Sequence, residues 1–373
     1  MSDVQPLRTA SLRLGGTPLP LVGRASIYTC GITPYDVTHL GHASTFVWSD
    51  LAVRVIRATG VEVVSCRNVT DVDDVLTEAA GAHGRDTSEF ALYQEYLFDK
   101  DMSSLGVARP SYEPRARHHV VQVQQLATAL LAGEHAYVRH GYVLFRGAEV
   151  AARSGLSRSE ALACFAEHGG DTHDAIREDP FDVPLWRPSK DAEPAWPSPW
   201  GPGRPGWHAE CAAMAMSVLG TGVDILVGGS DLAFPHHAYQ CAMAEAVTSV
   251  GPFARARMYV GAVRRDGAKM AKSTGNLTLV TDLLREHSPA AIRLLLLDRE
   301  WRLDWDYDAA LLGTAAGRLE QLFSAAGRPG GATAAGEVDT ALLSDLDVPG
   351  ALAIALDSGG EAARRALRLL SLG

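Results

Sequence analysis

The chain has 373 residues, of which 47% are hydrophobic and 21% charged, and its formal net charge is −10. Its length suggests two or three packed units, and its composition is that of a folded globular protein rather than a disordered or fibrous one. The negative charge disfavours nucleic acid as a partner, no apolar run approaches the ~20 residues of a membrane span, and the N-terminus lacks an export signal, so we expect a cytoplasmic protein.

The first elements along the chain form a strand–helix–strand unit. Residues 27–29 have the composition of a short strand. Residues 41–59 carry apolar side chains at helical spacing and are followed by Gly60, a typical residue after a helix, and residues 61–66 form a second strand. Such a unit predicts a parallel sheet with a ligand site at the carboxyl ends of its strands. We therefore expect an α/β protein with a doubly wound Rossmann fold.

The rest of the chain divides by composition. Residues 88–183 predict a mainly helical insertion with a hairpin near 136–145, and residues 184–285 return to the α/β pattern. Residues 1–87 and 184–285 would then be the two halves of one Rossmann catalytic domain. Residues 286–373 are rich in Leu and Ala and predict a C-terminal helical region. The elements expected in the second half are strands at 223–227 and 258–263 and a helix at 236–250.

Two short motifs lie where such a fold binds nucleotides. Residues 39–42 read HLGH at the start of the first helix, where a glycine lets a phosphate approach and imidazoles can donate to its charge. Residues 269–273 read KMAKS in a loop after the late strand, where lysines can neutralise departing pyrophosphate. A capping turn and a solvated lysine loop are the structural alternatives. Occurring in this order, the two motifs resemble the HIGH and KMSKS signatures of class I aminoacyl-tRNA synthetases.

A third group of residues indicates which amino acid is activated. Cys30 ends the first strand, Cys211 follows the run Trp-His-Ala-Glu, and His236 ends the segment Gly-Gly-Ser-Asp-Leu-Ala-Phe-Pro-His. The five cysteines are scattered and odd in number, which favours reduced thiols over a disulfide framework. The spacing of the trio is no metal signature by itself, so three unrelated core residues are the alternative. The segments around them, however, resemble the cysteinyl-tRNA synthetases and, more closely, their shortened relatives, the mycothiol cysteine ligases.

This resemblance implies one zinc ion per chain, held by Cys30, Cys211 and His236. Two thiolates and an imidazole leave a fourth tetrahedral position for the sulfur of a substrate. Serine offers only a hydroxyl and would be rejected without an editing domain.

The resemblance also implies ATP, with Mg²⁺, as a substrate. The cysteine carboxylate would attack the α-phosphate, and an amine would then attack the cysteinyl-adenylate and release AMP. The catalytic residues that stabilise phosphate charge would be His39, His42, Lys269 and Lys272. The residues that hold the adenylate would be Gly31, Ile32, Thr33, Thr45, Asn68, Val69, Thr70, Trp207, Gly229, Ser230, Asp231 and Val263. Each has a structural alternative, such as helix capping by Thr33 or core packing by Trp207.

No residue is an obvious general base for the amine. His208 and Asp231 are candidates because they lie within the motifs. The aspartates that follow Thr70, which are Asp71, Asp73 and Asp74, are expected to cap the turn and to be solvated.

A ligase is favoured over a tRNA synthetase. The segments 30–43, 167–172 and 196–208 resemble the ligases almost residue for residue, and fewer than a hundred residues follow Thr281, too few for an anticodon-binding region. The implied partners are L-cysteine, ATP and an amino-sugar acceptor, glucosaminyl-inositol, with no tRNA and no membrane, for a monomer or weak dimer. The alternatives are tRNA aminoacylation, a paralogue that uses another amine, and an inactive binding protein with this fold.

Some residues depart from the family pattern. Ala271 replaces a serine of KMSKS, Val227 the first of three glycines and Ala238 a usual glutamate, and we expect the last two changes near the zinc pocket. Gln240 stands where the tRNA synthetases supply a carboxylate ligand, and a neutral amide there favours substrate sulfur as the fourth ligand.

Overall fold

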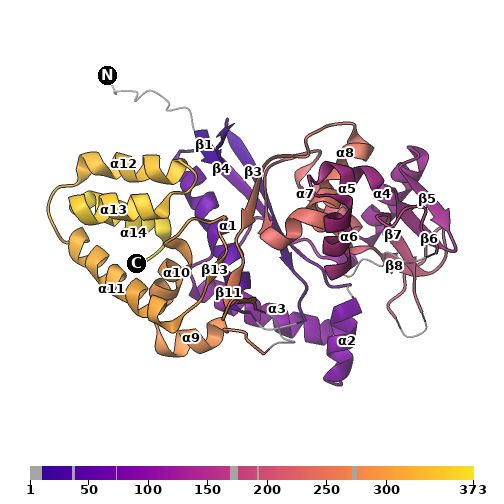
Figure 1. The fold of residues 1–373 in the computed structure, drawn as a ribbon, viewed down its shortest axis with the longest axis horizontal. Helices are drawn as coiled ribbons and strands as arrows, with labels where there is room; N and C mark the ends of the chain where they lie inside the picture. The colour runs from indigo at the N-terminus through magenta and orange to yellow at the C-terminus, as the bar shows by residue number, and fades with distance from the viewer. Residues whose placement is uncertain (1–10, 36–37, 73, 169–174, 191–192, 271–274) are drawn as a thin grey trace.

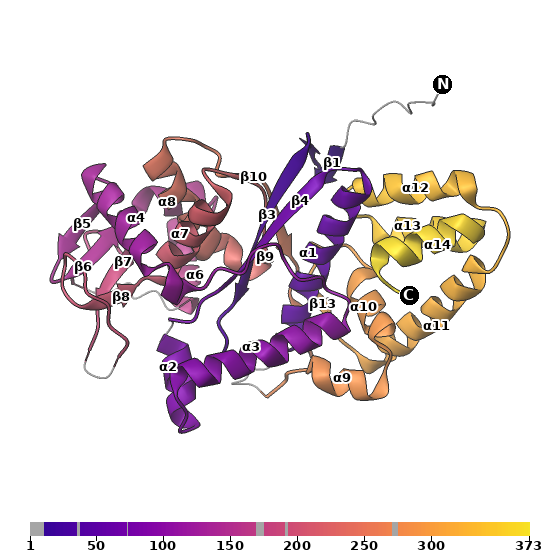
Figure 2. The ribbon, with the colours of Figure 1, turned by 180° about the vertical axis from the view of Figure 1, so that it is seen from behind.

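A computed structural model describes residues 11–35, 38–72, 74–168, 175–190, 193–270 and 275–373. Its centre is a parallel sheet of four strands in the order β10-β9-β3-β4 (Figure 2). The strands are β3 (Arg24–Ile32), β4 (Glu62–Val69), β9 (Val223–Gly229) and β10 (Ala254–Val260). Each neighbouring pair runs parallel. The parallel sheet and the first strand–helix–strand unit that the sequence predicts are confirmed.

The two faces of this sheet pack against different layers. Helix α1 (Leu40–Ala58) covers one face, and α7 (Trp207–Leu219) and α8 (Ala238–Thr248) cover the other (Figures 1 and 2). Side chains of β3 alternate between them, so that Ile27 belongs to the core around α1, whereas Tyr28 and Cys30 belong to the core around α7. This period of two therefore turns Cys30 towards the helices from which the other predicted metal ligands come.

The first helix follows its sequence signals. His39 is the N-cap of α1, and its Nδ1 accepts a hydrogen bond from the backbone N–H of Gly41 at 3.1 Å. The helix ends at Ala58, two residues before Gly60, close to the predicted end. The HLGH motif is thus built into the start of a helix at the carboxyl edge of the sheet.

The chain segment between β4 and α7 forms a second body of structure. Strands β5 and β6 form the predicted hairpin within an antiparallel sheet β5-β6-β7-β8. The core of this part continues into α7 and α8, through residues such as Ala212 and Tyr239. In contrast, Phe98 and Met102 of α3 pack in the core around α1. Cores are shared across the predicted segment boundaries, and the four-part division of the chain stays a prediction. The elements are α2 (Asp74–Ala82), α3 (Thr87–Ser104), the 3-10 helix η1 (Ala116–His118), α4 (Val120–Ala132), β5 (Ala136–Arg139), β6 (Tyr142–Phe145), α5 (Ala148–Arg153), α6 (Arg158–Glu167), β7 (Val183–Pro188) and β8 (Gly203–Pro205).

The C-terminal part is helical, as predicted, and packs on α1 (Figure 2). A small sheet β12-β11-β13 joins it to the parallel sheet. The helices and strands are β11 (Val263–Arg265), β12 (Ala268–Lys269), α9 (Val280–Glu286), α10 (Pro289–Leu297), β13 (Trp305–Asp306), α11 (Ala309–Ala326), α12 (Ala332–Leu343), α13 (Val348–Ser358) and α14 (Gly360–Leu370).

Three local predictions differ from the structure. The strand expected at 258–263 is interrupted, since β10 ends at Val260 and the chain turns into β11. At this turn Gly261 approaches Leu303 so closely that a side chain at Gly261 would lie 2.2 Å from the Leu303 carbonyl oxygen. The helix expected from residue 236 begins at Ala238, after a kinked segment at Ala233–His237 in which Phe234 has extended backbone angles. An N-terminal hairpin of β1 (Ser11–Leu14) and β2 (Thr17–Pro20) was not anticipated.

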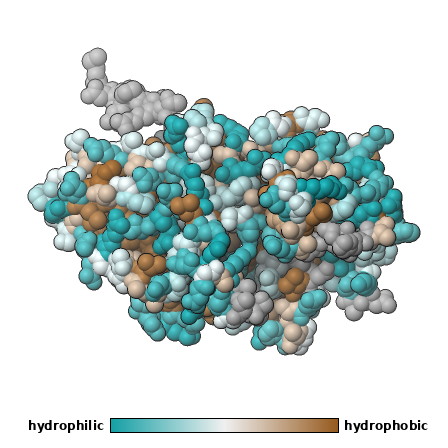
Figure 3. Space-filling model, viewed as in Figure 1, coloured by the Kyte–Doolittle hydropathy of each residue, from teal (hydrophilic) through white to brown (hydrophobic). Residues whose placement is uncertain are grey.

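The molecular surface offers no broad apolar area on the face drawn in Figure 3, where hydrophilic side chains predominate and hydrophobic ones are scattered. None of the helices among the described residues combines the length and the apolar character that crossing a bilayer requires.

Candidate active site and metal centre

The carboxyl ends of β3, β4 and β9 border one cavity of about 550 Å³. This is the edge at which a doubly wound sheet binds its ligands. The predicted site residues that line it are Cys30, Gly31, Ile32, Thr33, His39, His42, Thr45, Asn68, Thr70, Trp207, Cys211, Gly229, Ser230, Asp231, His236, Val263 and Lys269. Val69 is buried and is not part of this lining. Lys272 lies outside the described residues.

The two histidines of HLGH stack on each other, with ring centroids 4.0 Å apart. Burial, together with His42 and Lys269, lowers the pKa of His39 from 6.5 to about 3, so its imidazole is neutral at physiological pH. Because Nδ1 accepts the Gly41 N–H, the proton of the neutral ring lies on Nε2. His39 can therefore offer one N–H to a phosphate oxygen without carrying a charge.

Lys269, the first lysine of KMAKS, pairs with Asp231 from the turn after β9. Its Nζ lies 2.5 Å from Oδ2 of Asp231. Burial of Asp231 opposes its ionisation, but Lys269 outweighs this effect and the pKa of the carboxyl falls below its usual value. The cavity thus holds an anionic group suited to an ammonium and a cationic group suited to a phosphate.

The ends of β3 and β4 are joined by side-chain hydrogen bonds. The hydroxyls of Thr33 and Thr70 are 2.7 Å apart, and Asn68 Oδ1 accepts the N–H of Gly31 at 2.9 Å. A side chain at Gly31 would lie 1.7 Å from the carbonyl oxygen of Asn68, so a glycine is required for this approach. Thr33 does not cap α1, because His39 occupies that position.

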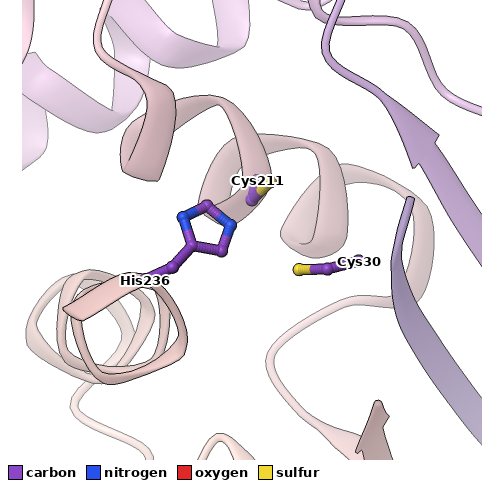
Figure 4. A group of neighbouring side chains, drawn as sticks. All are labelled: Cys30, Cys211 and His236. Carbon is purple, nitrogen blue, oxygen red and sulfur yellow. The ribbon is translucent and has the colours of Figure 1, made fainter. Parts of the chain in front are cut away.

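Cys30, Cys211 and His236 converge on one point (Figure 4). Their ligand atoms all lie within 4.8 Å of one another, and all three side chains are buried. Burial, followed by the adjacent Cys211, raises the pKa of Cys30, and burial, followed by His208 and His237, lowers that of His236 well below 6.5. A divalent cation would offset the cost of placing two thiolates here. Two soft sulfur donors and a neutral imidazole fit zinc.

Trp207 and His208, at the start of α7, both contact the ring of His236. Trp207 stacks on its ring with centroids 4.1 Å apart, and His208 Nδ1 lies 2.8 Å from His236 Nδ1. Burial, with a smaller contribution from His168, lowers the pKa of His208 to about 3. His208 is buried and is absent from the cavity lining, which favours a role in orienting His236 over a role as base for an incoming amine. A carboxylate, carbonyl or water more commonly occupies this place beside a metal-ligating histidine.

Among the described residues that depart from the family pattern, Gln240 alone contacts a predicted metal ligand. Val227 packs in the core on the α1 face of the sheet, and Ala238 packs against the core of α7 and α8, and neither lines the cavity. Gln240 is fully buried, with Oε1 3.6 Å from Cys30 Sγ. Ala271 and residues 169–172 of the ligase-like segment lie outside the described residues.

The aspartates after Thr70 differ from the expected solvated turn in one respect. Asp71 is buried, and its Oδ2 lies 2.6 Å from Nε of Arg117. It therefore serves as a structural anchor. Asp73 and the side chain of Asp74 lie outside what the structure describes.

Several lining residues escaped the sequence analysis. They are Tyr35, Thr38, Phe46, Phe98, Leu232, Val260, Gly261, Ala262, Met270 and Leu277. Phe98 comes from α3, which packs on α1 with its ring 4.9 Å from that of Phe46. No motif marks such a residue, because its position depends on packing between distant helices. Tyr35 and Met270, in contrast, lie inside quoted motifs and could have been found there.

The chain matches the family described as "tRNA synthetases class I (C) catalytic domain" over residues 20–317. It is 45% identical over 344 residues to the L-cysteine:1D-myo-inositol 2-amino-2-deoxy-alpha-D-glucopyranoside ligase of Mycolicibacterium vanbaalenii. The aligned region covers 89% of this chain and 80% of the relative. The enzyme of the same name from Streptosporangium roseum is 43% identical over 359 residues, covering 92% and 88%.

Solved structures share the fold at low sequence identity. Methionyl-tRNA synthetase from Mycobacterium tuberculosis, in complex with methionyl-adenylate, superposes with a TM-score of 0.63 at 16% identity over 94% of this chain and 82% of its own. The LeuRS of Agrobacterium radiobacter K84 gives a TM-score of 0.61 at 11% identity, covering 93% and 82%. These likenesses establish a class I synthetase fold.

Proposed function

Because this chain belongs to the class I cysteinyl-type synthetase catalytic-domain family and to its branch of cysteine ligases, we propose that it joins L-cysteine to the amine of glucosaminyl-inositol, a step of mycothiol biosynthesis. It is a ligase of the class I synthetase type. The reaction would consume ATP with Mg²⁺ and release pyrophosphate and AMP. The reduced thiols that the site needs are consistent with a cytoplasmic protein, and we expect a monomer or weak dimer.

One observation carries the proposal: the trio Cys30, Cys211 and His236 borders the same cavity as the HLGH turn and Lys269. A thiol-selective site and a phosphate site within one cavity favour chemistry on a cysteine carboxylate. Zinc bound to the trio would ligate the sulfur of the substrate, for which the hydroxyl of serine is a poor substitute.

In the first step the cysteine carboxylate attacks the α-phosphorus of ATP, and pyrophosphate leaves. His39, at the N-terminus of α1, would donate Nε2–H to a phosphate oxygen, where the helix dipole also favours negative charge. Lys269 and Lys272 would neutralise the departing pyrophosphate. Asp231 would bind the ammonium of the substrate once Lys269 has turned to the phosphates. Fixing both reactants in this way supplies most of the rate.

In the second step the acceptor amine attacks the carbonyl carbon of the cysteinyl-adenylate. The amide bond forms, the bond to the phosphate breaks, and AMP leaves. Trp207 would form a wall of the pocket beside His236. Thr33 and Thr70 follow the carboxyl ends of β3 and β4 and line the same cavity, where their hydroxyls can bind polar atoms of the adenylate.

The acceptor is tested by offering cysteine and ATP with either glucosaminyl-inositol or tRNA and detecting the products by mass spectrometry. We expect the amide of cysteine with the sugar amine and no cysteinyl-tRNA. Formation of cysteinyl-tRNA alone would identify a tRNA synthetase. Amide formation with other amines only would identify a paralogue, and absence of AMP release with every acceptor would contradict the proposal.

A further inference from the structure

Gln240 contacts the sulfur of Cys30 from behind the cavity. It lies on α8, four residues after His236, and its side chain is fully buried. Its Oε1 is 3.6 Å from Cys30 Sγ, from which it accepts a hydrogen bond. Because Gln240 does not line the cavity, it reaches this sulfur without touching a substrate.

Only one of the two polar atoms of the Gln240 carboxamide has a hydrogen-bond partner among the described residues. Among the described residues, Nε2 is buried without a hydrogen-bond partner, whereas Oε1 accepts the thiol proton of Cys30. A cysteine that ligates a metal is a thiolate and has no proton to donate. A half-turn of the carboxamide exchanges its two ends, after which Nε2 donates to the thiolate. The contact with sulfur decides the orientation, since the far end finds no described partner.

Asn68 makes the matching contact with the other sulfur. Its Nδ2 lies 3.5 Å from Cys211 Sγ, while its Oδ1 accepts the backbone N–H of Gly31. The Gly31 contact fixes which end of the amide faces Cys211, so Nδ2 is the donor. Each predicted thiolate ligand thus faces one buried carboxamide, from β4 in one case and from α8 in the other.

We propose that Gln240 is a positioning residue of the metal centre and donates an N–H···S hydrogen bond to the Cys30 thiolate, as Asn68 does to Cys211. The inference rests on the proposed function, because it concerns the zinc and cysteine site. A carboxamide stabilises thiolate charge without adding charge of its own. A carboxylate at this position, which the tRNA synthetases have, can itself bind the metal and take a coordination position there. Gln240 therefore holds Cys30 in place and keeps that position open.

The test uses the full chain, loaded with zinc or with cobalt(II), and the variant Gln240→Met, which keeps the length of the side chain but removes the donor. Loss of a hydrogen bond to a metal ligand lowers metal affinity about 10–100-fold, so transfer of zinc to a chelating dye should be at least about tenfold faster than in wild type. In the cobalt form, the sulfur-to-cobalt charge-transfer band should move to lower energy, because the thiolate electrons lose a stabilising contact.

Two further variants complete the test. In Gln240→Glu, the spectrum of the cobalt form before cysteine is added should differ from that of the wild type, because a carboxylate oxygen can join the ligands of the metal. Met243→Leu changes another buried side chain of α8, one that packs in the core shared with α4, and should leave zinc transfer and the cobalt spectrum unchanged.

The outcomes separate this inference from the proposed function. A folded Gln240→Met that transfers zinc at the wild-type rate with an unshifted band overturns the inference alone. A wild-type chain that holds no zinc, or whose cobalt spectrum does not respond to cysteine, contradicts the proposed function and the inference with it. If Gln240→Met does not fold, Gln240→Asn, which withdraws the amide by one methylene, is judged by the same two measurements.

Discussion

Asp231 and Lys269, which both line the cavity, form an ion pair with Nζ 2.5 Å from Oδ2. In the proposed reaction these residues bind different parts of the reactants, the ammonium of cysteine and the pyrophosphate of ATP. In the ligand-free protein Lys269 therefore occupies the place of the cysteine ammonium beside Asp231, and Asp231 the place of the pyrophosphate beside Lys269. Binding of both substrates exchanges one protein ion pair for two protein–substrate pairs.

This exchange predicts distinct effects for the two residues. Replacing Asp231 with Asn removes the anion for the substrate ammonium, and a charge-assisted hydrogen bond contributes about 1.5–3 kcal/mol. The KM for cysteine in pyrophosphate exchange should rise about ten- to hundredfold, while the KM for ATP changes little. Lys269→Met should lower kcat without a comparable rise in the KM for cysteine. Equal effects of both variants on the KM for cysteine would refute this division of roles.

Metal retention should depend on Cys211 and not on its buried neighbour Cys66. Both cysteines belong to the same core cluster, but only Cys211 lies in the trio. After purification with zinc and gel filtration, Cys211→Ala should contain little zinc, whereas Cys66→Ala should stay near one ion per chain. Metal analysis by mass spectrometry decides between them, and stoichiometric zinc in Cys211→Ala would show that the site is misassigned.

His39 should make the stability of the ligand-free protein acid-sensitive. Its pKa is lowered from 6.5 to about 3, chiefly by burial, so below about pH 6.5 the unfolded chain binds a proton that the folded chain refuses. The stability that neutral His39 contributes is thus present above about pH 6.5 and declines as the pH falls towards about 3. Urea unfolding of His39→Asn, which keeps a capping oxygen, should show a smaller loss between these values. The exposed His135→Asn is the control, and an identical pH dependence in wild type and His39→Asn would contradict the prediction.

A buried ion pair should dominate the attachment of the C-terminal helices. Arg293 of α10 is fully buried, and its guanidinium donates to Asp50 of α1 at 2.5 Å and to the carbonyl oxygens of Leu105 and Leu370. Arg293→Met leaves the two carbonyl oxygens without their donor and Asp50 with Arg54 as its remaining cation, and it should lower the free energy of unfolding by about 2–5 kcal/mol. Arg285→Met breaks an exposed pair with Asp282 and should cost about 0–1 kcal/mol. Denaturant unfolding measures both, and equal costs would contradict the prediction.

Local patterns in the sequence predicted much of the framework. The spacing of apolar residues predicted α1 and its flanking strands, and intact motifs indicated the segments that bring Cys30, Cys211 and His236 together. The period of two in β9 also indicates the direction of the Val227 side chain, which packs on the same face of the sheet as Ile225.

Other features depend on packing that no local pattern encodes. The contact of Gln240 with Cys30 requires α8 to pack on the face of the sheet to which Cys30 points, and Phe98 reaches the cavity only because α3 packs on α1. The role of His208 beside His236 likewise arises from two segments that are distant in the chain. The contacts of these residues could be assigned only once the helices were placed on the sheet.

ATP–pyrophosphate exchange without any acceptor measures activation of cysteine at this site. We expect exchange that requires cysteine, falls by at least about a hundredfold with serine, and is lost in Cys211→Ala but kept in Cys66→Ala. Exchange that serine supports equally, or that survives in Cys211→Ala, would contradict this expectation.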